Sequence, residues 1–361
     1  MSKLEASASI TPEELALATR NHGMPLEALT YDVTPVGLHY LLIHYDIPVV
    51  DPTSWRLTIG GSVRRELELS LDDLRARRSV RQPVTMECAG NGRGRLSPRP
   101  VSQPWLNEAV GTAEWTGTPL RPLLEEAGIR QGAVEVLFSG LDRGVEGGVE
   151  QQYERSLPVD EALQDEVMLA YAIGDEPLPP QHGFPLRLVV PGWYGMTNVK
   201  WLERVTLLDQ PFEGYQNTWS YNFRQTPEDA GERVTRMEPR ALMVPPGIPI
   251  FATRERHAEL ARHRVSGRAW SGRGTIERVE VSDDGGATWQ DSQLGEQASR
   301  WSWRAWDWEW TPSGPGDYEL CCRATDSAGN TQPLEASWNL HGFANNQVQR
   351  VAVTVTGGGE A

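Results

Sequence analysis

Short apolar runs, broken by glycine and proline, dominate the chain from residue 50 to residue 210. Alternating or continuous apolar positions predict strands over 55–59, 84–88, 134–138, 167–173, 186–190 and 199–208. The pattern predicts short helices over 11–19, 70–75, 120–127 and 158–163, with Thr11 and Ser70 as caps of the first two and Gly128 at the end of the third. Strands and helices do not alternate regularly, so the pattern predicts an irregular mixed α+β fold and not a doubly wound parallel sheet.

A change of pattern marks a second region of the chain. Residues 224–249 are polar and proline-rich, which is typical of a connection. Beyond them helix signals nearly vanish, and alternating strands at 276–282, 301–310, 317–325 and 350–355 are separated by turn residues. About seven short strands in roughly 110 residues indicate an immunoglobulin-like all-β sandwich. We therefore expect an N-terminal extension (1–30), a first domain (31–235) and the sandwich (241–356).

The charge balance excludes some partners. The net charge is −15 at pH 7, whereas a protein that grips a phosphate backbone needs a basic face. Nucleic acid and anionic membrane surfaces are therefore not expected as partners. No stretch approaches the ~18–20 apolar residues of a membrane span. The N-terminus shows no signal-peptide pattern, so we expect a cytoplasmic protein, or a periplasmic one if a signal has been removed.

The chain has three cysteines, which is no disulfide framework. Cys321 and Cys322 lie in a strand-like run, where small half-buried apolar residues are expected. Cys88 ends a predicted strand and begins the loop Cys-Ala-Gly-Asn-Gly, followed by Arg93. A thiolate is stabilised by cations and backbone N–H groups, and it is a soft ligand for a transition metal. From the residues alone, an inert buried cysteine is the favoured alternative.

The run from Thr85 to Arg93 resembles the Cys-Ala-Gly-Asn motif of the sulfite oxidase and assimilatory nitrate reductase family. Blocks at 105–117, 170–192 and 199–202 resemble further signatures of this family in the same order. The block at 282–289 resembles its dimerisation domain. The resemblance implies a molybdenum ion bound by one molybdopterin dithiolene and by the thiolate of Cys88. It also implies a molybdopterin-dependent oxidoreductase that transfers an oxygen atom at sulfur, as a homodimer.

The same resemblance implies a set of site residues. The resemblance assigns cofactor contacts to His44, Asp142, His182, Arg187, Asn198, Val199 and Lys200. Catalytic roles beside Cys88 fall on Arg93, Trp105 and a tyrosine, for which Tyr221 is favoured over Tyr215. Arginine and lysine are suited to neutralise the pterin phosphate. For several of these residues a structural role is the alternative: a turn for Asp142, a loop for His182 and a surface position for Lys200.

Two positions depart from the family pattern. The family block Arg-Asn-His corresponds to Leu42-Ile43-His44, and a second pocket arginine corresponds to His341. Each charge-assisted pair with a dianion contributes ~1.5–3 kcal/mol, so loss of both weakens sulfite binding by about 10²-fold or more. We therefore expect a bulkier or less charged sulfur compound, including a sulfur group carried by another protein.

Other expectations concern electron transfer and assembly. No Cys-x-x-Cys-His motif is present and no further domain is seen, so we expect no haem in this chain and an external acceptor, such as a cytochrome or oxygen. The alternatives are a reductase of sulfoxide-type substrates with the same cofactor, and a non-catalytic binding module with Cys88 in its core. The tryptophan-rich segment 301–310 fits a dimer interface or the sandwich core, and the core is favoured.

Overall fold

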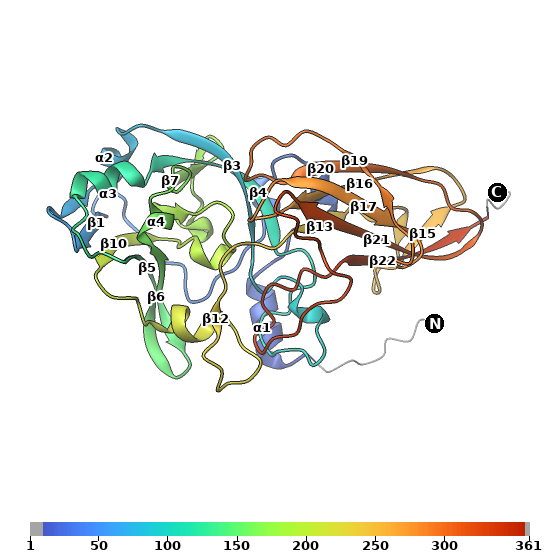
Figure 1. The fold of residues 1–361 in the computed structure, drawn as a ribbon, viewed down its shortest axis with the longest axis horizontal. Coiled ribbons are helices and arrows are strands. Elements are labelled where there is room, and N and C mark those ends of the chain that lie inside the picture. Colours follow the sequence, from blue (N-terminus) through green and yellow to red (C-terminus); the bar gives the residue numbers. More distant parts are fainter. Residues whose placement is uncertain (1–9, 358–361) are drawn as a thin grey trace.

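The computed structural model describes residues 10–357 and shows two parts that pack side by side (Figure 1). Residues 1–9 of the expected N-terminal extension lie outside the described residues. The first part mixes short helices with two sheets, and the second is a β-sandwich, so the predicted fold class is confirmed. Within the described range, no helix combines the length and apolar character that crossing a membrane requires.

Two sheets form the frame of the first part. One has the strand order β2-β1-β10-β5-β6, in which only β1 and β10 run parallel. The other has the order β3-β4-β7-β8, with β9 paired to β7. The bounds are β1 (Leu57–Gly61), β2 (Leu67–Leu69), β3 (Val80–Glu87), β4 (Val110–Pro119), β5 (Glu135–Glu146), β6 (Val149–Pro158), β7 (Met168–Ile173), β8 (Glu176–Pro177), β9 (Arg187–Val189) and β10 (Leu202–Leu208).

The helices are short, and the first two begin at the predicted capping residues. Thr11 and Glu14 form a capping box at the first helix, and Ser70 does the same with Asp73 at the second. Gly128, in the left-handed region at φ +73°, ends the third helix. The helices are α1 (Pro12–Arg20), α2 (Leu71–Arg75), α3 (Arg121–Ala127) and α4 (Val159–Ala162), with single turns η1 (Leu26–Thr30), η2 (Val36–Leu38), η3 (Arg93–Arg95), η4 (Pro180–His182), η5 (Gly195–Thr197) and η6 (Gln216–Ser220).

The second part stacks a four-stranded sheet, β13-β16-β20-β19, against a six-stranded one, β14-β15-β22-β21-β17-β18. A two-stranded ribbon, β11-β12, precedes it. The bounds are β11 (Asn222–Phe223), β12 (Glu232–Arg233), β13 (Arg240–Met243), β14 (Ile248–Pro249), β15 (Arg256–Glu259), β16 (His263–Trp270), β17 (Ile276–Ser282), β18 (Gln290–Asp291), β19 (Gln293–Leu294), β20 (Arg304–Trp310), β21 (Gly316–Asp326) and β22 (Gln349–Thr356).

The structure differs from the predicted pattern in several places, and strands β4, β6 and β16 were not predicted. The segment 224–249 is not only a connection, because β13 within it is an edge strand of the sandwich. The tryptophan-rich strand begins at Arg304, later than predicted. The two tryptophans before it, Trp301 and Trp303, pack against the first part: the Trp301 carbonyl accepts from the Thr85 N–H at 2.8 Å, and the Trp303 N–H donates to Thr85 Oγ1 at 2.7 Å. Within β20, Trp306, Trp308 and Trp310 are buried in the sandwich core, as favoured.

Apolar side chains from both sheets of the first part share one core. Ile59, Phe138, Leu169 and Val205 are fully buried in it. Burying a side chain of this size contributes about 1.5–3 kcal/mol. This core holds β5 and β9, and a second cluster that includes Val84 and Met86 holds β3. Cys88 follows β3 directly, at the seam between the two parts.

Candidate active site

The loop that begins at Cys88 is tightly folded. The Cys88 N–H donates to the Ala109 carbonyl at 2.9 Å, and the Asn91 N–H donates to the Cys88 carbonyl at 2.9 Å. Gly92 has φ +88°, and a Cβ there would lie 2.8 Å from the Asn345 carbonyl oxygen, so glycine is required. Cys88 is only 7% exposed. The loop therefore presents one thiol with small residues around it.

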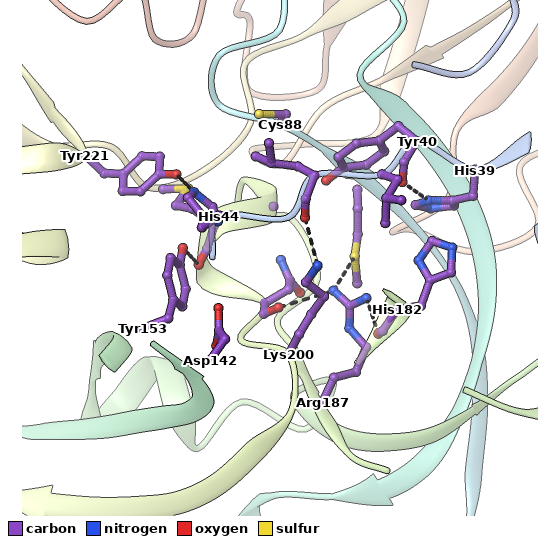
Figure 2. Close-up of a pocket in the computed structure, with 16 residues that line it drawn as sticks. His39, Tyr40, His44, Cys88, Asp142, Tyr153, His182, Arg187, Lys200 and Tyr221 are labelled. Atoms are coloured by element: carbon purple, nitrogen blue, oxygen red, sulfur yellow. Dashed lines mark hydrogen bonds between the residues drawn. The ribbon is translucent and has the colours of Figure 1, made fainter. Parts of the chain in front are cut away.

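A cavity on one side of Cys88, here called the inner cavity, gathers most of the predicted cofactor residues (Figure 2). Its free volume is about 60 Å³. Its walls come from the segment 39–44, the ends of β3 and β5, η4, β9 and the loop before β10. The lining residues include His39, Tyr40, Leu42, His44, Cys88, Asp142, Tyr153, His182, Arg187, Asn198, Lys200 and Tyr221.

Two buried cations lie at the far end of the inner cavity. Arg187 donates to the carbonyls of His182 at 3.0 Å and Asn198 at 3.2 Å, and it stacks on Trp115. The Lys200 amine donates to the Leu42 and Gln181 carbonyls. Burial lowers the pKa of Arg187 to about 10, and burial together with Arg187 lowers the pKa of Lys200 to about 7. An anion placed here would stabilise both cations.

The three histidines of the inner cavity are uncharged. Burial is the main cause that lowers the pKa of His39 to about 4, of His44 to about 3 and of His182 to about 2. A neutral imidazole has one donor and one acceptor nitrogen, so each ring can pair with a polar heterocycle. Burial also raises the pKa of Asp142 to about 6, and Lys200 opposes this shift.

Unpartnered polar atoms provide the test of whether a cofactor fits. His39 Nε2, Asp142 Oδ1 and Arg187 Nε are buried and have no hydrogen-bond partner in the protein. Leaving such a group unpaired costs about 1–3 kcal/mol, so three around one cavity indicate a polar ligand. A pterin ring edge carries donors and acceptors, and its phosphate suits the two cations. The residues present therefore fit molybdopterin.

A second cavity, here called the outer cavity, lies beyond Cys88 and holds about 240 Å³. Cys88, Leu42, His44 and Tyr221 line both cavities. The outer walls also include Leu17, Ile43, Tyr45, Arg93, Gln103, Trp105, Val145, Glu146 and Phe343. Cys88 therefore separates the space that fits the cofactor from a space open to a substrate.

The charges of the outer cavity nearly cancel. Arg93 donates to the backbone carbonyls of His341 at 2.7 Å and Gln103 at 3.2 Å, and its guanidinium lies over the Phe343 ring. The Glu146 carboxylate accepts from the Gln216 amide at 2.8 Å and from the Tyr45 hydroxyl at 3.2 Å. His341 contributes its carbonyl here, and burial lowers the pKa of its imidazole. The outer wall thus carries one guanidinium and one carboxylate together with apolar side chains.

Tyr221 lies where the two cavities meet. Its hydroxyl is 2.6 Å from His44 Nε2, and its ring stacks on Phe343 and lies under Arg155. Burial raises the pKa of Tyr221, so the hydroxyl keeps its proton. Burial also raises the pKa of the Cys88 thiol, which Arg93 opposes, so metal binding must displace a proton from sulfur.

The structure brings most of the predicted site residues together, although it does not test their roles. Among the described residues, Tyr215 is not part of either cavity wall, and Val199 packs in the core with its carbonyl bonded to Leu188 N–H. Sequence reasoning missed His39, Tyr40 and Tyr153. For Lys200, which was predicted, the composition gives a further indication: it is one of two lysines in the sequence, the other being Lys3, among 34 basic residues.

Comparison with known proteins places the chain in a family. Residues 44–216 match the oxidoreductase molybdopterin binding domain, and residues 252–356 match the Mo-co oxidoreductase dimerisation domain. Sulfite oxidase of Gallus gallus is 36% identical, over 86% of this chain and 70% of that one. Mitochondrial sulfite oxidase of Homo sapiens is 35% identical over 92% of this chain, and NADH nitrate reductase 2 of Phaseolus vulgaris is 32% identical over 93%.

A solved structure shows the same architecture. The crystal structure of the sulfane dehydrogenase SoxCD from Paracoccus pantotrophus matches 99% of this chain and 89% of that one, with a TM-score of 0.80 and 26% identity. The chain belongs to the sulfite oxidase family of molybdopterin-binding oxidoreductases. It spans 64% of the length of the human enzyme and 41% of that of the bean nitrate reductase.

Proposed function

We propose that this protein oxidises a sulfur compound by two-electron oxygen-atom transfer, with Cys88 as the protein ligand of molybdenum. The supporting observation is the position of Cys88 between a cavity with unpartnered polar atoms and a second, open cavity. When bound, the molybdenum cofactor would supply the redox chemistry. The protein's own groups would bind the pterin, orient the substrate and exclude water.

The inner cavity supplies a group for each part of the pterin. Arg187 and Lys200 would neutralise the phosphate, since both are buried cations without a carboxylate bonded to them. Asp142 and His39 would pair with the ring edge through their unpartnered atoms. His182, Asn198 and His44 would complete the wall.

The outer cavity favours a substrate that carries less charge than the sulfite dianion. Its single guanidinium already has two backbone acceptors, and Glu146 repels a second negative charge. Leu17, Leu42 and Val145 provide apolar surface for a substituent. An organic sulfinate meets these conditions, because it has one negative charge, an apolar group and a sulfur lone pair. Its oxidation is R–SO₂⁻ + H₂O → R–SO₃⁻ + 2 e⁻ + 2 H⁺.

The remaining parts of the proposal follow from the sequence and the family. The two electrons pass singly to an external acceptor, a cytochrome or oxygen. The protein forms a homodimer through its sandwich, as the match to the dimerisation domain suggests. A sulfur group carried on another protein would enter the same outer cavity.

A substrate panel tests this proposal. The protein is produced in a host that makes molybdopterin, its molybdenum content is measured, and ferricyanide serves as acceptor for methanesulfinate, benzenesulfinate and sulfite. We expect about one molybdenum per chain and a higher kcat/KM for the sulfinates than for sulfite. A preference for sulfite would contradict the substrate class. Activity only in reverse, on sulfoxides with reduced viologen, would contradict the direction, and absence of molybdenum would contradict the function itself.

A further inference from the structure

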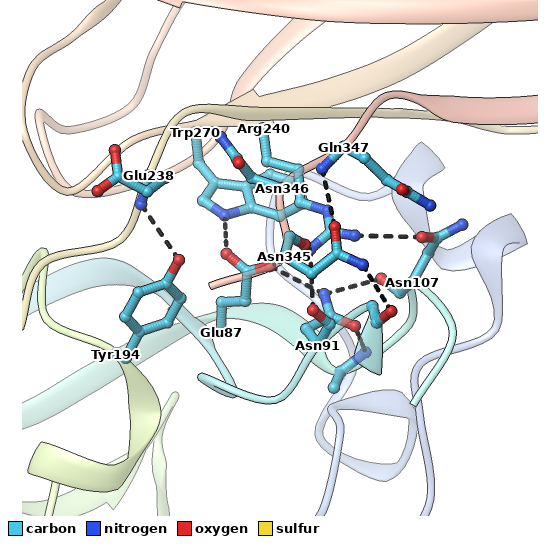
Figure 3. Close-up of polar contacts among 12 residues, drawn as sticks. Glu87, Asn91, Asn107, Tyr194, Glu238, Arg240, Trp270, Asn345, Asn346 and Gln347 are labelled. Carbon is cyan, nitrogen blue, oxygen red and sulfur yellow. Dashed lines mark hydrogen bonds and ion pairs between the residues drawn. The ribbon is translucent and has the colours of Figure 1, made fainter. Parts of the chain in front are cut away.

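The residue before the proposed metal ligand is bound by the second part of the chain (Figure 3). Glu87 is 2% exposed, and its carboxylate accepts from Arg240 Nη1 at 2.7 Å and from Trp270 Nε1 at 2.9 Å. Arg240 belongs to β13 and Trp270 to β16, which are neighbours in the sandwich. Asn91, within the cysteine loop, donates to the same carboxylate at 2.9 Å. The sandwich therefore reaches the first turn of the loop through one buried carboxylate.

Arg240 also connects the sandwich to the first part of the chain. Its Nη2 donates to Asn107 Oδ1 at 3.1 Å, and its Nη1 donates to the Asn345 carbonyl at 2.9 Å as well as to Glu87. The guanidinium is 1% exposed, so water does not compete for these bonds. A planar guanidinium fixes the directions of several bonds at once, which an amine cannot do. Removal of one partner from such a buried pair would leave the other charge uncompensated.

A turn near the C-terminal end of the sandwich is hydrogen-bonded to the rest of the Cys88 loop. The Ala344 N–H donates to the Ala89 carbonyl at 2.7 Å, and Asn345 Nδ2 donates to the Gly92 carbonyl at 2.7 Å. Ala344 has φ +51°, a left-handed conformation that is unfavourable for alanine. Asn339 supports this turn with two hydrogen bonds to Phe343. A strained residue that is held by its surroundings often marks a functional site.

We propose that Arg240 is a positioning residue for the metal site, and that the sandwich forms the second wall of the Cys88 loop in addition to any role in dimerisation. Arg240 does not touch Cys88; it acts through Glu87, Asn91 and Asn345. This inference rests on the proposed role of Cys88 as the molybdenum ligand. Loss of Arg240 loosens the loop and changes the coordination geometry at the sulfur, whereas loss of another buried arginine at the seam does not.

Arg268 provides the matched control. It lies in β16, is 6% exposed, and donates to the Thr30 carbonyl at 3.1 Å and pairs with Asp32 at 3.0 Å. It therefore joins the sandwich to the first part of the chain without a hydrogen bond to the Cys88 loop. The variants to compare are Arg240→Met, Arg240→Lys, Arg268→Met and Asn345→Ala. Asn345→Ala removes one side-chain bond to the loop and serves if Arg240→Met does not fold.

Two measurements test the inference. Hydrogen exchange of loop amides in the cofactor-free protein should be about tenfold faster or more in Arg240→Met, about fivefold faster in Asn345→Ala and unchanged in Arg268→Met. Arg240→Lys should restore part of the protection. In the loaded protein, the electron paramagnetic resonance spectrum of Mo(V) should shift in Arg240→Met and not in Arg268→Met.

Equal loop exchange in Arg240→Met and Arg268→Met would overturn the inference, as would an unchanged Mo(V) spectrum in Arg240→Met. If Arg240→Met does not fold, unchanged loop exchange in Asn345→Ala would overturn it in the same way. The exchange measurement uses no cofactor and no substrate. A failure of the proposed function, seen as absence of molybdenum from the wild-type protein, is therefore distinguishable from a failure of the role of Arg240.

Discussion

The hydroxyl of Tyr221 lies 2.6 Å from Nε2 of His44, and both residues line the two cavities that meet at Cys88. The two side chains are 177 positions apart in sequence. The pKa of His44 is lowered to about 3 by burial and that of Tyr221 is raised, so the pair holds one shared hydrogen bond between neutral groups. This places a hydroxyl where the two cavities meet, and it can donate to a ligand there when His44 Nε2 carries the proton of the neutral ring.

Tyr221→Phe removes that hydroxyl and little else. We expect kcat/KM for the sulfur substrate to fall about 10- to 100-fold, because a hydrogen bond to a developing charge contributes about 1.5–3 kcal/mol. The free energy of unfolding should change by about 1 kcal/mol or less. Tyr215→Phe is the matched control, and an equal loss of activity in both variants would contradict the assignment of Tyr221.

Leu42→Arg places a guanidinium at a position that lines both cavities. The KM for sulfite should fall about 10- to 100-fold, since one charge-assisted pair contributes ~1.5–3 kcal/mol. The KM for a sulfinate with an apolar substituent should rise, because the apolar wall is lost. Val49→Arg adds the same charge at an exposed position outside both cavities and serves as control. If both variants alter sulfite binding equally, the effect is one of overall charge and the account of the pocket is wrong.

Lys200 can be observed individually, because Lys3 is the other lysine of the chain. Reductive ¹³C-methylation of the cofactor-free protein gives a magnetic resonance signal that Lys200→Met removes. That signal should titrate near pH 7, since burial and Arg187 lower this pKa to about 7 from 10.5. Cofactor binding should raise the pKa, because a phosphate stabilises the protonated amine. A titration near pH 10 in the cofactor-free protein would contradict the buried placement.

The same shift predicts how stability depends on pH. Between about pH 7 and pH 10.5 the unfolded chain keeps the Lys200 proton while the folded chain releases it. The unfolded state therefore binds more protons, and the free energy of unfolding rises with pH in this window. Urea unfolding of the cofactor-free protein at pH 7.5 and pH 9.5 should show wild type gaining stability relative to Lys200→Met. A constant difference between the two proteins would rule out the shift.

The amino-acid pattern predicts the four helices and several strands of this fold but misses β4, β6 and β16, and its failures have physical causes. Capping residues Thr11 and Ser70 and the glycine at 128 give the helix limits directly. Strand β13 lies in a proline-rich run and shows no strand pattern of its own. Its residues form a strand because they pair with β16, which lies elsewhere in the chain.

The candidate site also has residues that the sequence identifies and residues that it does not. Cys88 and Arg187 are identifiable because they stand in motifs that resemble the family's. His39 and Tyr153 carry no local signal, and only tertiary packing brings them to the inner cavity. The contact of Glu87 with Arg240 joins residues 153 positions apart, which no spacing rule indicates.

X-ray absorption at the molybdenum edge tests the role of Cys88 most directly. The loaded wild-type protein is compared with Cys88→Ser, and Cys321→Ala serves as control because its thiol is buried in the sandwich. We predict one sulfur neighbour fewer around molybdenum in Cys88→Ser than in wild type, or loss of the metal altogether, and no change in Cys321→Ala. The same number of sulfur neighbours in Cys88→Ser and wild type would contradict the account.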